Sequence, residues 1–114
     1  MASDRDAVIV TAPLNDATRA MVDANFIAGM QPGSWLINVG RGPIVVGTAV
    51  ADAIESGHLA GAALDVFEAE PLADERLRQL RGLILGSHNA SNTFEACHRT
   101  HEQAIANLIA NLRK

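Results

Sequence analysis

The chain has 114 residues, 48% of them hydrophobic, and a formal net charge of −4. This composition can build one small domain with its own core and argues against a disordered chain. No basic run offers a surface for nucleic-acid phosphates, no apolar stretch approaches the roughly 20 residues that cross a bilayer, and the polar N-terminus is not typical of a signal peptide. The single cysteine, Cys97, cannot form an internal disulfide, so we expect a reducing, cytoplasmic location.

Short apolar runs alternate with segments of helical pattern along the chain. The runs predict strands at Ala7–Val10, Trp35–Ile37, Gly61–Val66 and Leu83–Leu85. The longer segments predict helices over Thr18–Met30, Thr48–Ser56 and Thr93–Leu112. We expect Thr48 to cap the second helix, and Asn92 with Glu95 has capping-box spacing at the third. The mixed charges of residues 74–81 are typical of a solvated loop.

The strand runs are apolar throughout rather than alternating, which is typical of a parallel sheet covered on both faces. Strands that alternate with helices indicate the same architecture. The fold class is therefore α/β, with about four parallel strands. Ligands of such sheets bind beyond the carboxyl ends of the strands, so reactive residues at these ends are the first candidates for a site.

Three reactive side chains follow three of the predicted strands. Arg41 lies between two glycines, Glu70 precedes a proline, and His88 follows the shortest apolar run. Arginine binds a carboxylate through its planar fork of donors, histidine moves a proton near neutral pH, and a neighbouring carboxylate stabilises the imidazolium. Glu68 is an alternative to Glu70 as the partner of His88. These groups can anchor a 2-keto acid and protonate its carbonyl, and the hydride that a reduction needs implies a nicotinamide cofactor.

Several motifs in the right order carry a family resemblance that runs essentially from end to end. They are Thr11–Leu14, Met30–Gly33, Ile37–Gly42, Gly57–Phe67, Glu70-Pro71 and His88–Thr93. With them the chain resembles the C-terminal part of the NAD-binding domain of D-isomer-specific 2-hydroxyacid dehydrogenases. That family includes glyoxylate/hydroxypyruvate reductases and D-3-phosphoglycerate dehydrogenase. The resemblance implies a partial Rossmann fold over residues 1–90, with helices mainly on one face, and a long C-terminal helix over residues 91–114.

The resemblance also implies roles for single residues. As catalytic residues, Arg41 would bind the substrate carboxylate and carbonyl, and His88 would be the acid/base, paired with Glu70. Asp65 would contact the nicotinamide carboxamide of NAD or NADP, although it could instead cap local backbone N–H groups. The remaining cofactor-binding positions are Pro13, Val39 and Gly40, together with Arg41 and His88. We expect no metal, because Cys97 and His101 on one helix turn make at most an incomplete site.

Two features of the family are absent from this sequence. There is no Gly-x-Gly-x-x-Gly turn to hold the cofactor pyrophosphate, and no substrate lobe. We therefore expect this chain alone to be inactive as a dehydrogenase; the alternative is a non-catalytic remnant that acts as an oligomerising or binding module. One sheet face would be open and Ala7–Val10 would be an unpaired edge, which favours a homo-oligomer formed by face, by edge or by exchange of the last helix.

Overall fold

The computed structural model describes residues 3–112, and its centre is a sheet of four parallel strands in the order β1-β2-β3-β4. The strands are β1 (Ala7–Val10), β2 (Ser34–Asn38), β3 (Leu59–Leu64) and β4 (Leu83–Leu85). The predicted α/β class and the number of strands are confirmed. Two strands begin and end where the sequence predicted, while β3 begins and ends two residues earlier than expected.

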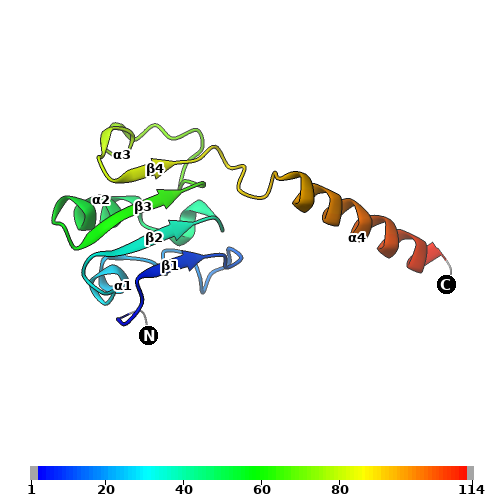
Figure 1. Cartoon of the computed structure of the whole chain (residues 1–114), viewed down its shortest axis with the longest axis horizontal. Coiled ribbons are helices and arrows are strands. Elements are labelled where there is room, and N and C mark those ends of the chain that lie inside the picture. Colours follow the sequence, from blue (N-terminus) through cyan, green and yellow to red (C-terminus); the bar gives the residue numbers. More distant parts are fainter. Residues whose placement is uncertain (1–2, 113–114) are drawn as a thin grey trace.

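Three helices cover one face of this sheet (Figure 1): α1 (Ala24–Ala28), α2 (Gly47–Glu55) and α3 (Glu75–Gln79). The core lies between this face and α1 and α2, because the strand residues that point there are buried, among them Val10, Leu36, Ala62 and Leu64. Their register puts Leu36 opposite Ala62. Apolar side chains from the helices, including Ile27 and Val50, complete the core and are 2% and 0% exposed.

The opposite face of the sheet is open, as the sequence predicted. We call it the open face, and its members alternate with the buried strand residues: Ile9, Trp35, Ile37, Ala63 and Ile84. Ile9 is 61% exposed, Trp35 45% and Ile84 66%. The register places these side chains on neighbouring strands, with Ile9 opposite Ile37 and Ala63 opposite Ile84. β1 is also an edge strand of the described sheet.

The last helix, α4 (Phe94–Leu112), leaves the sheet altogether. Figure 1 shows it projecting from the carboxyl edge on a short linker, which gives the molecule its extents of 58 × 30 × 26 Å. None of its residues is buried. Its large apolar side chains form what we call the α4 stripe, all of them exposed: Phe94, Ile105, Leu108, Ile109 and Leu112.

The helix predicted over Thr18–Met30 is wrong in extent, because only α1 forms within it. The Asn15 side chain accepts hydrogen bonds from the N–H groups of Ala17 and Thr18, which closes a turn in place of a helix. The chain then pairs with a distant loop, since Val22 N–H donates to Ile44 O at 3.0 Å. Helix formation starts only at Asp23, whose carboxylate accepts the Phe26 N–H at 2.8 Å.

Three smaller predictions are also wrong. α2 begins before Thr48: its N-cap is Val46, which makes no side-chain capping bond. The cap of α4 is Thr93 rather than Asn92, because the Thr93 hydroxyl accepts the Ala96 N–H at 3.2 Å. Residues 74–81 are not a loop but contain α3.

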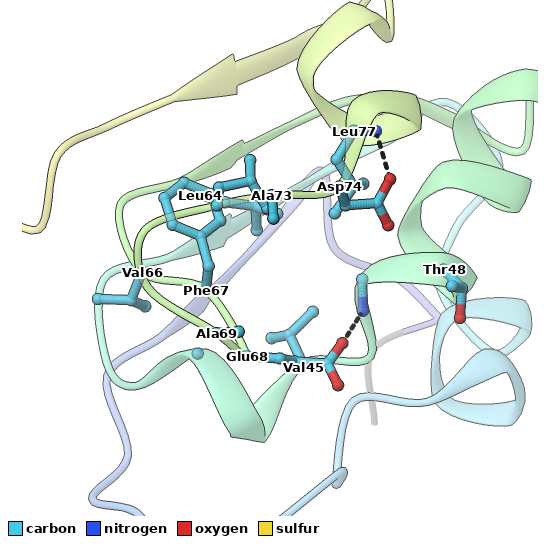
Figure 2. A pocket seen from close by; sticks show the side chains of 13 residues that line it. Val45, Thr48, Leu64, Val66, Phe67, Glu68, Ala69, Ala73, Asp74 and Leu77 are labelled. Carbon is cyan, nitrogen blue, oxygen red and sulfur yellow. Dashed lines mark hydrogen bonds between the residues drawn. The ribbon is translucent and has the colours of Figure 1, made fainter.

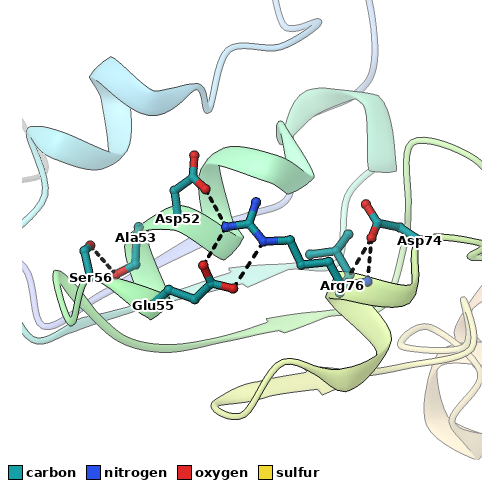
Figure 3. A network of polar contacts seen from close by, with 7 residues as sticks. Asp52, Ala53, Glu55, Ser56, Asp74 and Arg76 are labelled. Atoms are coloured by element: carbon teal, nitrogen blue, oxygen red, sulfur yellow. Dashed lines mark hydrogen bonds and ion pairs between the residues drawn. The ribbon is translucent and has the colours of Figure 1, made fainter.

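Helix α3 is fixed by two charged residues. Asp74 caps its N-terminus by accepting the N–H groups of Arg76 and Leu77. The Arg76 guanidinium reaches α2 and donates to Asp52 at 2.6 Å and to Glu55 at 2.7 and 3.1 Å (Figure 3). The hydrogen bond to Glu55, followed by that to Asp52, raises the pKa of Arg76. These contacts attach α3 to α2.

Candidate active site

The Arg41 turn follows β2 and is held by the last residue of that strand. Asn38 is fully buried, its Oδ1 accepts the Gly40 N–H at 3.1 Å, and its Nδ2 donates to Arg41 O at 3.2 Å. Arg41 itself is exposed and folds its Nη1 back to Gly40 O at 2.7 Å. The turn thus presents a guanidinium at the carboxyl edge of the sheet, where the sequence predicted it.

The Glu70 segment lies directly against this turn. A Cβ atom added to Gly42 would overlap the carbonyl group of Phe67, so only glycine allows the two backbones to approach this closely. Phe67 N–H in turn donates to Glu70 Oε1 at 3.1 Å. The turn that carries Arg41 and the loop that carries Glu70 are therefore in backbone contact, although they lie 29 positions apart in the sequence.

His88 and Glu70 form the predicted pair. His88 Nδ1 lies 2.8 Å from Glu70 Oε2. This hydrogen bond, followed by that from the Phe67 N–H, lowers the pKa of Glu70, which keeps the carboxylate ionised. An ionised carboxylate accepts the Nδ1 proton and leaves Nε2 as the ring nitrogen for proton transfer. His88 has a φ of 58°, the left-handed region that a residue with a side chain rarely adopts.

Glu68, the alternative partner, points elsewhere. Its Oε1 accepts the Gly47 N–H at 2.7 Å and so satisfies the first turn of α2, the role that the sequence had assigned to Thr48. Figure 2 shows this contact at the rim of an apolar cavity of about 220 Å³ whose walls include Leu64, Val66 and Leu77. The structure therefore separates the two glutamates, with Glu70 in the site and Glu68 at a helix end.

Asp65 follows β3 and holds the His88 loop. Its carboxylate accepts the N–H of Ala90 at 2.8 Å and of Asn89 at 3.1 Å, and its backbone O accepts the His88 N–H at 2.8 Å. The N–H donors of Ala90 and then Asn89 lower the pKa of Asp65, against the opposing effect of burial. The capping role that the sequence left open is thus present, while a contact with the nicotinamide carboxamide stays a prediction.

Four of the expected cofactor-binding residues share one cleft at the carboxyl ends of β1 and β2, whereas Asp65 and His88 do not line it. It has a volume of about 500 Å³ and is lined by Pro13, Val39, Gly40 and Arg41, among others. The floor at Gly40 is backbone, because a Cβ atom there would lie 3.0 Å from Ala12 O. This cleft fits one end of a dinucleotide; the sequence holds no glycine-rich turn for the pyrophosphate.

Arg41 and the His88–Glu70 pair lie at the same carboxyl edge of the sheet but do not contact each other. His88 and Glu70 line a second cavity of about 350 Å³ with Arg78 and Ser87. No hydrogen bond or ion pair within the described residues joins Arg41 to His88, so a substrate would have to bridge them. In residues 3–112 no group of three His, Cys, Asp or Glu side chains could hold a metal, and none of the helices combines the length and hydropathy that crossing a bilayer requires.

Reasoning from the sequence missed the roles of two residues: Asn38, which holds the Arg41 turn, and Glu68, which was considered only as a partner of His88. Asn38 carried a usable signal, since a polar residue that ends an apolar strand just before a glycine is a candidate to cap the following turn. The contact of Glu68 carried none, because its partner Gly47 lies 21 positions away in the sequence.

Comparison with known proteins identifies the family. Residues 1–90 match the model of the D-isomer specific 2-hydroxyacid dehydrogenase, NAD binding domain. The chain is 47% identical over 95 residues to (S)-sulfolactate dehydrogenase of Chromohalobacter salexigens, covering 82% of this chain and 31% of that protein. It is 39% identical over 107 residues to glyoxylate reductase of Pyrococcus furiosus, covering 94% of this chain and 32% of the relative. The chain thus spans about a third of these relatives.

Solved structures agree with this result. The apo form of Rhodotorula graminis D-mandelate dehydrogenase superposes with a TM-score of 0.84 at 33% identity, over 94% of this chain and 31% of that one. The NADPH-dependent glyoxylate/hydroxypyruvate reductase of Sinorhizobium meliloti, solved with NADP and malonate, gives 0.77 at 38% identity over 83% of this chain and 30% of that one. From its partial Rossmann sheet and these matches, the chain belongs to the D-isomer-specific 2-hydroxyacid dehydrogenases, within their NAD-binding domain.

Proposed function

We propose that the chain supplies the substrate-binding and proton-transfer part of an NAD(P)-dependent 2-hydroxyacid dehydrogenase. The observation that carries this proposal is the His88–Glu70 pair, 2.8 Å apart, at the same sheet edge as the Arg41 turn. The substrate class is a 2-keto acid such as glyoxylate or hydroxypyruvate, which relatives named as glyoxylate reductase and glyoxylate/hydroxypyruvate reductase support. The cofactor is NAD or NADP, in the cleft at Val39 and Gly40.

Each residue has a distinct task in this reaction. The Arg41 guanidinium binds the substrate carboxylate and polarises the adjacent carbonyl. Glu70 holds the Nδ1 proton of His88, which orients the ring and stabilises its charged form. His88 then donates the Nε2 proton to the carbonyl oxygen during reduction and recovers it during oxidation. The bound nicotinamide supplies the hydride.

Binding of a 2-keto acid can be tested on this chain without turnover. We expect oxamate, an amide analogue of a 2-keto acid, to shift the NMR signals of Arg41 and His88 at millimolar concentration. Arg41→Ala should abolish the shift of the His88 signals, whereas Arg81→Ala, which removes an exposed arginine outside the site, should leave the shifts of both residues unchanged. Equal shifts with Arg41→Ala, or none in the unaltered chain, would contradict the proposal. We expect no turnover of glyoxylate by the chain alone, because the pyrophosphate turn is absent from its sequence.

A second candidate function, as an oligomerising module, is favoured by the two uncovered apolar surfaces. The open face lacks a helix, and the α4 stripe lacks a surface to cover. We propose that a second copy of the chain is the partner, with α4 of each copy lying on the open face of the other. The linker favours exchange over folding back, since Asp65 fixes it as far as Ala90 and only residues 91–93 remain before α4.

The dimensions allow this exchange. A helix of 19 residues is about 28 Å long and 10 Å wide, whereas four strands span about 15 Å. Each α4 can therefore cross the whole open face. Two such contacts, counted on both partners, bury on the order of 1,000 Å² of accessible surface, which is about the smallest area of a specific protein interface.

Sedimentation tests the exchange. We expect a dimer whose Trp35 emission is blue-shifted, because Trp35 lies on the open face and becomes buried. Ile84→Asp and Leu108→Asp should each give a monomer with red-shifted emission, since each places a charge in the apolar contact. Gln103→Asp, on the opposite side of α4, is the matched control and should stay dimeric. A monomer at all concentrations, or a dimer that neither apolar substitution affects, would refute this arrangement.

We also place the chain in a reducing compartment such as the cytosol. Its one cysteine, Cys97, is a free thiol that donates to Asn92 Oδ1 at 3.4 Å. We therefore expect the thermal midpoint to be the same with and without a reductant. A midpoint that falls on reduction would point to an intermolecular disulfide and contradict this placement.

A further inference from the structure

Asn38 is a polar side chain in a place where sequence and packing favour an apolar one. It ends β2, is 0% exposed, and follows the apolar residues Leu36 and Ile37. Burying an amide is unfavourable unless both its donor and its acceptor find partners. Here both do, and both partners belong to the Arg41 turn: the Gly40 N–H and the Arg41 carbonyl.

The contacts form a chain that ends at the guanidinium. Gly40 donates its N–H to Asn38 and accepts Arg41 Nη1 on its carbonyl at 2.7 Å. Gly40 is also confined from the other side, because a Cβ atom there would lie 3.0 Å from Ala12 O and 3.3 Å from Val10 O. The Arg41 side chain is therefore held by the Gly40 carbonyl, and Gly40 is in turn held by the Asn38 amide.

We infer that Asn38 is a positioning residue that determines where Arg41 presents its guanidinium to the carboxylate of a 2-keto acid. The identity of the ligand in this inference rests on the proposed function, whereas the hydrogen bonds of Asn38 do not depend on it. Asn38 is too buried to meet a substrate, so its effect passes through its hydrogen bonds to Gly40 and to the Arg41 backbone. Ser34, at the other end of the same strand, provides a contrast: it is 2% exposed and its hydroxyl has no hydrogen-bond partner among the described residues.

The test compares three variants of the full chain by proton–nitrogen NMR. Asn38→Ala removes both side-chain bonds, Asn38→Asp keeps an acceptor for Gly40 but loses the donor to Arg41 O, and Ser34→Ala removes a buried polar group that makes no bond. The readouts are the solvent exchange of the Gly40 amide, the Nε–H signal of Arg41, and the affinity for oxamate.

A positioning role predicts that Asn38→Ala keeps the signals of the core while the Gly40 amide exchanges faster and the Arg41 Nε–H signal moves. Oxamate should bind about tenfold more weakly, the equivalent of one charge-assisted hydrogen bond. Ser34→Ala should change none of the three. Asn38→Asp should keep the Gly40 amide protected at neutral pH but move the Arg41 Nε–H signal, and that signal should return toward the original in acid, because a protonated carboxyl can again donate to Arg41 O.

Unchanged Gly40 and Arg41 signals in Asn38→Ala would overturn the inference. So would a uniform loss of structure in Asn38→Ala together with no acid recovery in Asn38→Asp, since that pattern indicates a role in stability alone. If the unaltered chain does not bind oxamate, the proposed function fails, while the Gly40 and Arg41 signals still decide whether Asn38 positions the turn.

Discussion

Adding a single atom, the Cβ of an alanine at position 42, should break the contact between the Arg41 turn and the Glu70 loop. In Gly42→Ala the added Cβ would overlap the Phe67 carbonyl and lie 2.6 Å from Phe67 Cα. Carbon atoms in contact are normally about 3.5–4.0 Å apart, so the Phe67 carbonyl, the nearest group, requires the two backbones to separate by about 1.5 Å or more. Both sides are main chain, Gly42 is buried and Phe67 is half-buried, and neither can yield by rotating a side chain.

The expected loss of stability is at the upper end of the range for overpacked sites, about 3 kcal/mol. For a domain of this size that corresponds to a fall in the thermal midpoint of about 10 °C or more. Thermal unfolding followed by circular dichroism measures it. The matched control is Gly29→Ala: Gly29 has helical dihedrals, with φ −81° and ψ −4°, and an added Cβ would meet nothing closer than 3.4 Å. That variant should change stability by about 1 kcal/mol or less.

A second readout separates the local effect from the global one. Phe67 N–H donates to Glu70, so a displaced Phe67 should also disturb the pair that Glu70 makes with His88. The reasoning is refuted if the free energy of unfolding of Gly42→Ala lies within about 1 kcal/mol of that of the unaltered chain, which is the margin expected for the Gly29→Ala control. An intact His88–Glu70 pair in a destabilised Gly42→Ala would refute only the link between the turn and the pair.

Two further perturbations test the supports of the site. Arg76→Gln removes the hydrogen bonds that attach α3 to α2 and should lower the thermal midpoint more than Arg78→Gln, because the partner of Arg78 lies within α3 itself; equal effects would contradict this. The pKa of Asp65 is lowered in the folded chain. Its contribution to the stability of the fold is therefore complete at a pH above the usual pKa of 3.8, and it is lost as the pH falls through the lower pKa of the folded state. The thermal midpoints of the unaltered chain and of Asp65→Asn should therefore differ at about pH 6 and become equal at about pH 2. A difference that stays constant between these pH values would contradict the assignment.

The strands and the site residues were predictable because both leave a local signal. Four short apolar runs, each followed by polar or glycine-rich residues, define a parallel sheet and the edge at which its ligands bind. Arg41, Glu70 and His88 each follow a run, so their common edge could be inferred without coordinates. The open face was predictable for the same reason, since apolar residues on both sides of a strand require two covers.

The errors come from interactions between residues that are distant in the sequence. The pattern of Thr18–Met30 is helical, but contacts with residues 43–45 and the Asn15 turn prevent a helix over its first part. Helix α3 has only five residues and is stabilised by Arg76 reaching α2. For the two glutamates, the proline after Glu70 and the family resemblance indicated the correct partner of His88. The contact of Glu68 with Gly47 at the start of α2 could not be inferred, because the two residues are distant in the sequence.

The pairing of His88 with Glu70 rather than Glu68 is the central claim, and long-range proton–nitrogen NMR of the imidazole tests it directly. The structure predicts that the neutral form of the ring carries its proton on Nδ1, because Glu70 Oε2 lies 2.8 Å away. Glu70→Ala should remove this preference, while Glu68→Ala, which deletes the other glutamate, should leave the ring signals as they are. A proton on Nε2 in the unaltered chain, or a larger change with Glu68→Ala than with Glu70→Ala, would contradict the site described here.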